Sequence, residues 1–168
     1  MGDRKNLGPQ ESLEKMTDLA EDAKLCMFIT ALGQVPFNAR PMALQDVEED
    51  GTCWFFSAAD SQKNADIKGD NRVQLAFVNR PQSEFMTLYG TAEIIQDVEK
   101  AKELWNVFLT TWFDGADDPN LTMIRFKPEQ GHYWDTKSNK MVQSISIAIG
   151  AIRGKMTDHG VEGEMRIR

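Results

Sequence analysis

Four side chains between positions 40 and 63 could together bind a phosphate group. Arg40 offers a planar guanidinium, Lys63 a compact ammonium, and Ser57 and Ser61 offer hydroxyl groups. A dianionic phosphate is held by fixed cations and directed hydrogen-bond donors, and these side chains supply both. Ser61 to Lys63 also open a short polar segment, and the first N–H groups of a helix there would point at an anion. The stretch therefore predicts a phosphate site.

Aromatic residues lie directly beside these polar groups. Trp54, Phe55 and Phe56 precede Ser57 in a strand pattern. Alternation along a strand sends Trp54 and Phe56 to one face and Phe55 to the other, so we interpret all three first as core residues.

Other chemistries lack the residues that they need. His132 and His159 have no cysteine or carboxylate set at metal-ligand spacing, and the sequence has no Gly-x-Ser-x-Gly, paired-carboxylate or Gly-x-Gly-x-x-Gly motif. We therefore expect no metal site and no side chain that serves as an essential acid, base or nucleophile. Cys26 and Cys53 fall in apolar runs without Cys-x-x-Cys spacing, which predicts buried, reduced thiols in a reducing compartment.

Length and charge narrow the classes further. The chain has 168 residues and a formal net charge of −7. The length suits one domain, and the negative charge disfavours binding to nucleic acid or to an anionic membrane. Residues 1–10 lack the apolar core of a signal peptide, and no apolar run approaches the roughly 18 residues of a membrane span. We expect a cytoplasmic protein.

The first half of the chain reads as one helix followed by strands. Apolar residues recur at helical spacing over 12–25, after a cap at Ser12. Strand patterns follow at 26–32, 39–47, 52–58, 72–79 and 84–95, separated by turn residues, and a polar turn or helix is expected over 61–68. The connections are too short for parallel crossovers, so the sheet should be antiparallel.

In the second half of the chain, apolar spacing predicts the longest helix over 98–112, with Asp97 as its N-cap. The apolar residues of this helix could join the core or an interface. Residues 122–127 and 132–135 then read as a hairpin around Pro128 to Gly131. Residues 141–153 fit a strand or a helix equally well by periodicity. The polar end after 154 is expected to be a frayed tail.

Several short motifs in a fixed order resemble a known family. They are Arg40-Pro41-Met42, Asp50-Gly51, Trp54 to Ser57, Ser61 to Lys63, and Tyr133 to Asp135. This order resembles the general stress protein 26 branch of the pyridoxamine 5'-phosphate oxidase-like, FMN-binding split-barrel superfamily over about residues 12–155. The resemblance implies a single domain, mainly β with flanking α-helices, built as a six-stranded and mostly antiparallel split barrel. It also implies a helix over 141–153, and a homodimer with FMN at the subunit interface.

The resemblance also implies roles for individual residues. Arg40 and Lys63 would hold the FMN phosphate, backbone groups around Pro41 and Met42 would lie along the isoalloxazine ring, and Trp134 would approach the ring from the partner subunit. The full set of cofactor-binding candidates is Arg40, Pro41, Met42, Phe56, Ser57, Ser61, Gln62, Lys63 and Trp134. Packing alone would also explain Trp134, and an ordinary surface helix would explain Lys63. The oxidases proper usually have Arg at the position of Gln62, so its absence should weaken flavin affinity.

Two functions follow from this reading. One is a flavin-dependent oxidoreductase that acts on a small substrate, and the other is a non-catalytic flavin-binding or carrier protein in the stress response. Authentic pyridoxamine 5'-phosphate oxidase activity is disfavoured. Those enzymes hold their substrate with an Arg- and His-containing segment soon after the matching Trp, whereas residues 135–143 offer only Lys137 and Lys140.

Overall fold

The computed structural model describes residues 3–4, 6–136 and 160–167. The strands are β1 (Asp3–Arg4), β2 (Leu25–Thr30), β3 (Asn38–Ala43), β4 (Asp46–Val47), β5 (Cys53–Ala58), β6 (Arg72–Asn79), β7 (Glu84–Ile95), β8 (Leu121–Thr136) and β9 (Gly160–Arg166). The helices are α1 (Pro9–Ala23), α2 (Gln62–Gly69) and α3 (Val98–Leu104), with 3₁₀ helices η1 (Arg80–Gln82) and η2 (Val107–Thr111). Within these ranges, no helix is long and apolar enough to span a membrane.

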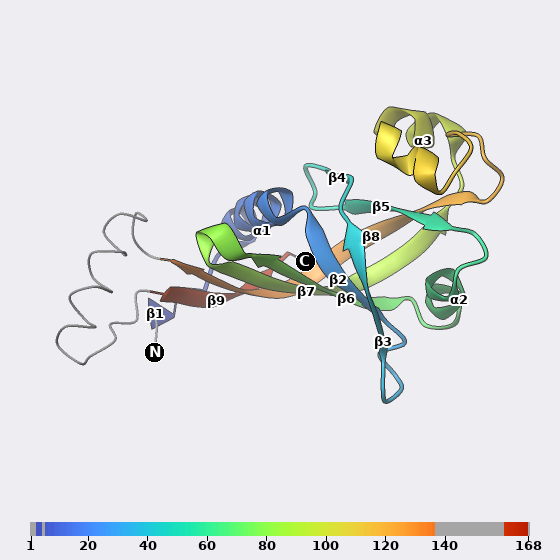
Figure 1. Ribbon diagram of the computed structural model, residues 1–168. Helices are drawn as coiled ribbons and strands as arrows, with labels where there is room; N and C mark the ends of the chain where they lie inside the picture. The colour runs from blue at the N-terminus through green and yellow to red at the C-terminus, as the bar shows by residue number, and fades with distance from the viewer. Residues whose placement is uncertain (1–2, 5, 137–159, 168) are drawn as a thin grey trace.

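All nine strands belong to one curled sheet in the order β1-β9-β8-β7-β6-β2-β3, with β5 paired to β8 and β4 to β5 (Figure 1). Strand β8 pairs with β5 along its first half and with β9 along its second half. The run of six antiparallel strands from β3 through β2, β6, β7 and β8 to β5 is open between β3 and β5. The fold is therefore a split barrel, as expected.

The strand count differs from the expected six. Strands β1 and β4 have two residues each, which leaves seven longer strands out of nine. The additional long strand is β9, which occupies the chain end that we expected to be frayed. Its residues pair antiparallel with β8 and, along their other edge, parallel with β1. Paired backbone groups on both edges explain why a polar segment is ordered here. The helix expected over 141–153 lies outside the described residues.

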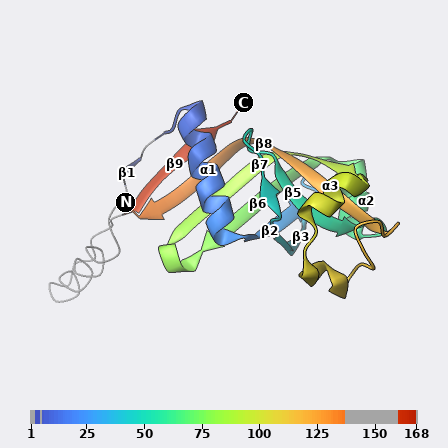
Figure 2. The same cartoon turned by 90° about the horizontal axis from the view of Figure 1, so that it is seen from above.

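The main core fills the concave side of the barrel, where α1 crosses the sheet (Figure 2). Met16 and Leu19 of α1 pack against Phe28, Phe55 and other buried side chains from the strands. The rings of Phe28 and Phe55 meet edge to face with centroids 5.2 Å apart. Helix α1 begins earlier than expected, because Gly8 caps it and Glu11 accepts a hydrogen bond from the Gly8 N–H.

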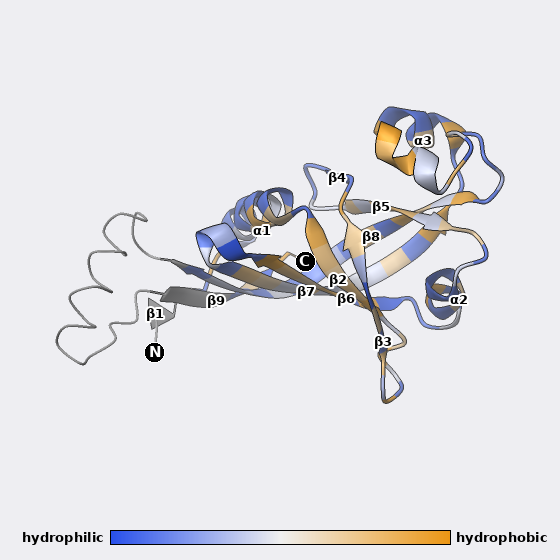
Figure 3. Ribbon diagram, in the orientation of Figure 1, coloured by the Kyte–Doolittle hydropathy of each residue, from blue (hydrophilic) through white to orange (hydrophobic). Residues whose placement is uncertain are grey.

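A second core lies on the other face of β5, under α3 and η2. It contains Trp54 and Phe56 with Leu109, Phe113 and neighbouring apolar residues. The alternation that placed Trp54 and Phe56 opposite Phe55 is confirmed. Hydrophobic residues concentrate on β2 and in the segment after α3, whereas α2 is hydrophilic (Figure 3).

The helix expected over 98–112 is wrong beyond Leu104. Asp97 caps α3 as expected, accepting from the Glu99 and Lys100 N–H groups. Trp105 then adopts an extended conformation and packs against Phe56, with ring centroids 6.5 Å apart. Asn106 caps the separate helix η2. Tertiary packing of Trp105 overrides the helical periodicity here, and α1, with 15 residues, is the longest helix described.

The hairpin expected around Pro128 is also wrong, because β8 runs through it as one strand of 16 residues. A register shift opposite Tyr89 and Gly90 pairs Tyr89 with Gln130 but Gly90 with Pro128. A β-bulge of this kind leaves one residue unpaired, and a proline, which has no N–H, is tolerated there. The turn-like sequence is thus accommodated as a bulge.

The two cysteines are buried, free thiols. Burial raises the pKa of the Cys26 thiol to about 12 and raises that of Cys53 as well. Both thiols therefore stay protonated at neutral pH, where a thiol is a poor nucleophile.

The bulge generates a first prediction. A Cβ atom added at Gly90 would lie 2.1 Å from the Lys127 carbonyl oxygen, whereas one added at Gly69 would meet nothing within 4 Å. Gly90→Ala should therefore lower the free energy of unfolding, measured with urea, by about 1–3 kcal/mol. The matched control Gly69→Ala should be neutral or slightly stabilising. Equal stability of the two variants would contradict the close approach at the bulge.

Candidate functional site

A cleft of about 410 Å³ lies where the barrel is open, between β3, β5, the start of α2 and η2. Its lining residues are Pro41, Met42, Ala43, Gln45, Phe56, Ser57, Ala58, Lys63, Leu109, Trp112 and Phe113. Five of the nine candidate residues from the sequence are among them: Pro41, Met42, Phe56, Ser57 and Lys63. The walls are mostly apolar, and Lys63 is the one charged residue that lines the cleft.

Lys63 is a partly buried cation at one end of the cleft. Among the described residues, it forms no ion pair and no side-chain hydrogen bond. Partial burial and the nearby charge of Arg40 lower the pKa of Lys63, while Asp60 raises it. An anion that entered the cleft would offset both unfavourable effects. The Gln62 and Lys63 backbone N–H groups also belong to the first turn of α2, where a helix favours negative charge.

Ser57 and Asn64 fix the start of α2 to the sheet. The Ser57 hydroxyl donates to the Asn64 side-chain oxygen at 2.7 Å, and the Asn64 amide nitrogen donates to the Thr122 hydroxyl at 2.9 Å. Thr122 in turn donates to the Ser57 carbonyl at 2.8 Å. All three residues are buried. The Ser57 hydroxyl thus serves this network, 3.1 Å from the Ser61 hydroxyl, while Ser57 itself lines the cleft.

Arg40 lies next to the cleft rather than in its lining. Its guanidinium donates to the Thr30 hydroxyl at 2.7 Å and to the Phe28 carbonyl at 3.3 Å, and it forms an ion pair with Asp66 at 3.4 Å. Asp66 also accepts from Thr30 and Asn38. The structure therefore places the Arg40 charge close to Lys63 but directs its hydrogen bonds toward β2 and α2.

The remaining three candidates have separate positions. Ser61 caps α2 and accepts from the Asn64 N–H. Gln62 is exposed and donates to Asp66 at 2.9 Å. Trp134 lies toward the far end of β8, where its ring is 4.4 Å from that of His132. A single chain does not bring Trp134 to the cleft, so its expected role requires a second chain.

The cleft fits the parts of FMN. Lys63 and the first turn of α2 suit the phosphate, and the apolar walls suit a flavin ring. Strand β3 is the last strand of the sheet order, so its outer edge presents backbone groups that no other described strand uses. Backbone N–H and C=O groups at such an edge can bond the polar edge of the ring without any particular side chain.

Sequence reasoning missed one wall of the cleft and the network behind it. Leu109 of η2, with Trp112 and Phe113 directly after it, forms one wall, which we call the η2 wall. Gln45 lies on the connection between β3 and β4. The apolar periodicity of 98–112 marked this segment for packing but gave no sign of the cleft. Asn64 and Asp66 looked like ordinary polar residues of a surface helix.

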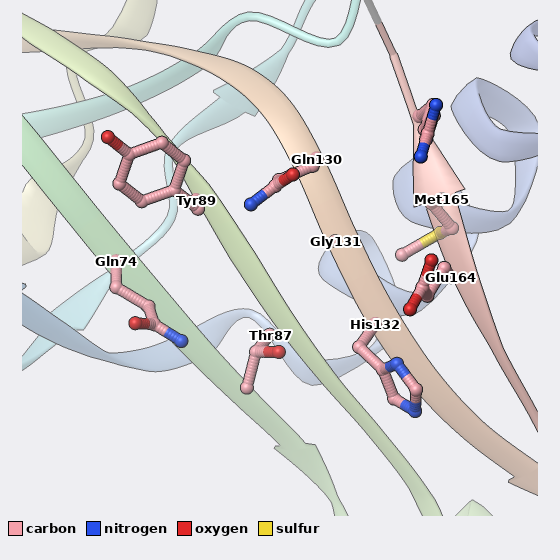
Figure 4. A pocket seen from close by; sticks show the side chains of 9 residues that line it. Gln74, Thr87, Tyr89, Gln130, Gly131, His132, Glu164 and Met165 are labelled. Carbon is pink, nitrogen blue, oxygen red and sulfur yellow. The ribbon is translucent and has the colours of Figure 1, made fainter.

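A second depression, of about 320 Å³, lies on the outer face of the sheet (Figure 4). Polar side chains of Gln74, Thr87, Tyr89, Gln130 and His132 project there from β6, β7 and β8, beside Glu164 and Arg166 near the end of the chain. None of the candidate cofactor residues lines this depression. It carries no apolar slot for a flavin ring, so the cleft at Lys63 remains the candidate site.

Asp66 gives a pH-dependent prediction. Partial burial raises its pKa, but hydrogen bonds from Gln62, Thr30 and Asn38 and the charge of Arg40 outweigh burial and lower the pKa from 3.8 to about 2. A depressed folded-state pKa stabilises the fold above about pH 4, and this stabilisation is lost as the pH falls toward 2.

Asp66→Asn should therefore lower the free energy of unfolding by about 1–3 kcal/mol at pH 7, and its deficit relative to the parent should shrink near pH 2. Urea denaturation at several pH values measures both. Asp22→Asn, at an exposed position of α1, should change stability by less than about 0.5 kcal/mol throughout. A deficit for Asp66→Asn that is independent of pH would contradict the charged network.

Comparison with known proteins supports the reading from the motifs. A family model described as pyridoxamine 5'-phosphate oxidase like matches residues 11–158. Protein bli-3 of Neurospora crassa is 29% identical over 127 residues, which cover 70% of this chain and 61% of that protein. This chain thus matches less than two thirds of its relative's length.

Two solved structures share the fold. The first, assigned to general stress protein 26 of Jannaschia sp. CCS1, has a TM-score of 0.77 and 22% identity, and the match covers 95% of this chain and 99% of that one. The second, the general stress FMN/FAD binding protein of Xanthomonas citri, has a TM-score of 0.66 and 27% identity, covering 77% and 92% of the two chains. With the family model matching most of its length, the chain belongs to the pyridoxamine 5'-phosphate oxidase-like family and resembles the general stress proteins 26 within it.

Proposed function

We propose that this protein binds FMN in the cleft at Lys63. The observation that carries the proposal is a partly buried cation at one end of the cleft, which forms no ion pair with a described residue and is the one charged residue among the described ones that line the cleft. A phosphate placed there gains a charge-assisted hydrogen bond from Lys63 and the N–H groups of the first turn of α2. The ring would lie along the edge of β3, against Met42 and Phe56.

The composition of the lining favours a phosphorylated planar ring over a small anion. Met42 and Phe56 offer apolar surface that inorganic phosphate would leave uncovered. A flavin ring would cover this surface, and its burial would add to the affinity. The Xanthomonas citri relative, described as FMN/FAD binding, supports the same class of cofactor. A dinucleotide would bring a second phosphate, and no second cation lines the cleft.

We further propose that bound FMN makes the protein an oxidoreductase. When bound, the flavin supplies hydride or single-electron transfer. The residues of this chain would hold the phosphate, orient the ring and exclude water from one of its faces. Trp112 lines the cleft yet is 70% exposed, so a second reactant could reach the ring past it. A protein that binds FMN but does not oxidise NAD(P)H or another reduced donor would instead fit a flavin carrier.

Replacing Lys63 tests the phosphate assignment. Wild-type protein should bind FMN at least about tenfold more tightly than riboflavin, because a charge-assisted hydrogen bond contributes about 1.5–3 kcal/mol. Lys63→Ala should weaken FMN binding about ten- to hundredfold and leave riboflavin binding within about threefold. Quenching of flavin fluorescence measures both constants.

The control is Lys68→Ala, which removes an exposed lysine from the same helix and should change FMN affinity less than about twofold. Equal affinity of the wild type for FMN and riboflavin would overturn the phosphate assignment. NAD(P)H oxidation with and without added FMN then separates the oxidoreductase from the carrier.

We also propose that the protein is a homodimer that uses the outer face of its sheet. Leu25, Val78, Phe85 and Trp134 are large apolar residues on this face, with exposures of 55%, 51%, 41% and 39%. Val78 pairs with Phe85, and Phe85 with Trp134, so these side chains form a row across neighbouring strands. A contiguous apolar row of this kind is typical of a protein interface. A second chain would cover it and could bring its own Trp134 toward a cleft.

Val78→Glu should therefore convert the dimer to a monomer in sedimentation at micromolar concentration, because a charge would be buried at the interface. Val107→Glu, which alters an exposed apolar residue of η2 away from this face, should leave the dimer intact. A wild-type monomer, or a Val78→Glu variant that still dimerises, would contradict the assignment of this face.

A further inference from the structure

We infer that the cleft holds a second subsite, formed by Gln45 and the η2 wall, for an uncharged planar aromatic molecule. The inference rests on the proposed function, because it assigns Lys63 to the cofactor phosphate. Three further observations support it: the hydrogen bonds that hold the Gln45 amide, the exposure of the Trp112 ring, and the lack of a second charged residue among the described ones that line the cleft.

Gln45 lines the cleft, and its side-chain amide is hydrogen-bonded at both ends. Its side-chain oxygen accepts from the Asn106 amide at 3.0 Å, and its nitrogen donates to the Ala43 carbonyl at 3.0 Å. The Gln45 backbone N–H donates to the Trp54 carbonyl at 2.9 Å, which ties the residue to the start of β5. One N–H and one lone pair of the amide remain for a ligand. A side chain held from both ends loses little freedom when it binds.

The η2 wall is rigid at its base and uncovered at its rim. Leu109 and Phe113 are buried in the second core with Trp54 and Phe56, so packing sets the position of η2. Trp112 lies between these anchors and lines the cleft, but its side chain is largely exposed. An exposed indole held on a rigid element offers a flat apolar surface on which a planar ring can stack.

The distribution of charge selects the ligand class. Of the eleven residues that line the cleft, only Lys63 is charged, and it follows the end of β5. The Gln45 backbone donates to the carbonyl of Trp54, near the beginning of the same strand. Roughly 10–13 Å of β5 therefore separate the Gln45 end of the cleft from the Lys63 end. With Lys63 bound to the cofactor phosphate, an anionic ligand would lose hydration without gaining a cation. A neutral ring with one hydrogen-bonding group fits instead.

The test uses a matched pair of probes, 2-naphthol and naphthalene-2-sulfonate, which share a ring system and differ in charge. Each is titrated into FMN-loaded protein at pH 7, and binding is followed by the visible absorption of the flavin and by tryptophan fluorescence. We expect 2-naphthol to bind at least about tenfold more tightly than the sulfonate. Trp112→Ala should weaken 2-naphthol binding about tenfold, and Gln45→Leu by several fold.

The control is Phe108→Ala, which removes an aromatic residue of η2 that is 78% exposed and does not line the cleft. It should change 2-naphthol affinity less than about twofold. If FMN binds but the two probes bind equally, or if Trp112→Ala has no effect, the subsite is wrong and the proposed function stands. If FMN does not bind, the proposed function fails, and titration of the flavin-free variants with 2-naphthol still decides the subsite.

Discussion

The buried hydrogen bonds among Ser57, Asn64 and Thr122 are the constraint on which the candidate site depends. They join the end of β5, the first turn of α2 and the start of β8 through side chains that solvent cannot reach. Each buried polar group would cost about 1–3 kcal/mol if it lost its partner, so the three elements hold one another in a single arrangement. Lys63 directly precedes Asn64 in the chain, so the network that holds Asn64 also fixes the position of the Lys63 backbone beside the cleft.

The two cations near the cleft, Arg40 and Lys63, differ in their partners and therefore in their roles. Arg40 is satisfied by Asp66, Thr30 and the Phe28 carbonyl, and it helps to hold α2 against β2 and β3. Lys63 feels the repulsion of Arg40 and the weaker attraction of Asp60, and it forms no ion pair with a described residue. The positive charge of Arg40 adds to that of Lys63, so the two together make the cleft favourable for an anion. The protein carries a net charge of −7, so this attraction is local rather than a property of the whole surface.

Strand β5 connects this polar end with the apolar walls. Phe55 faces the main core, while Trp54 and Phe56 support η2 on the opposite face. The strand is therefore buried on both faces, and its position is set by two cores at once. The length of β8 makes this possible, since its first half holds β5 and its second half holds β9. The opening between β3 and β5 persists because the two strands do not pair.

Local signals in the sequence determined strands β2, β3, β5, β6 and β7, the cap at Asp97 and the cation Lys63, whereas the cleft residues Met42 and Phe56 came from the family resemblance. Period-two alternation and capping side chains act between neighbours in the chain, so they can be read without the fold. Only the tertiary structure decided the bulge at Pro128, the end of α3 at Leu104, and the joining of η2 and Gln45 into one cleft. These features arise because pairing with β7, packing against Phe56 and hydrogen bonds to distant residues outweigh local preference, and such long-range contacts leave no periodic pattern in the sequence.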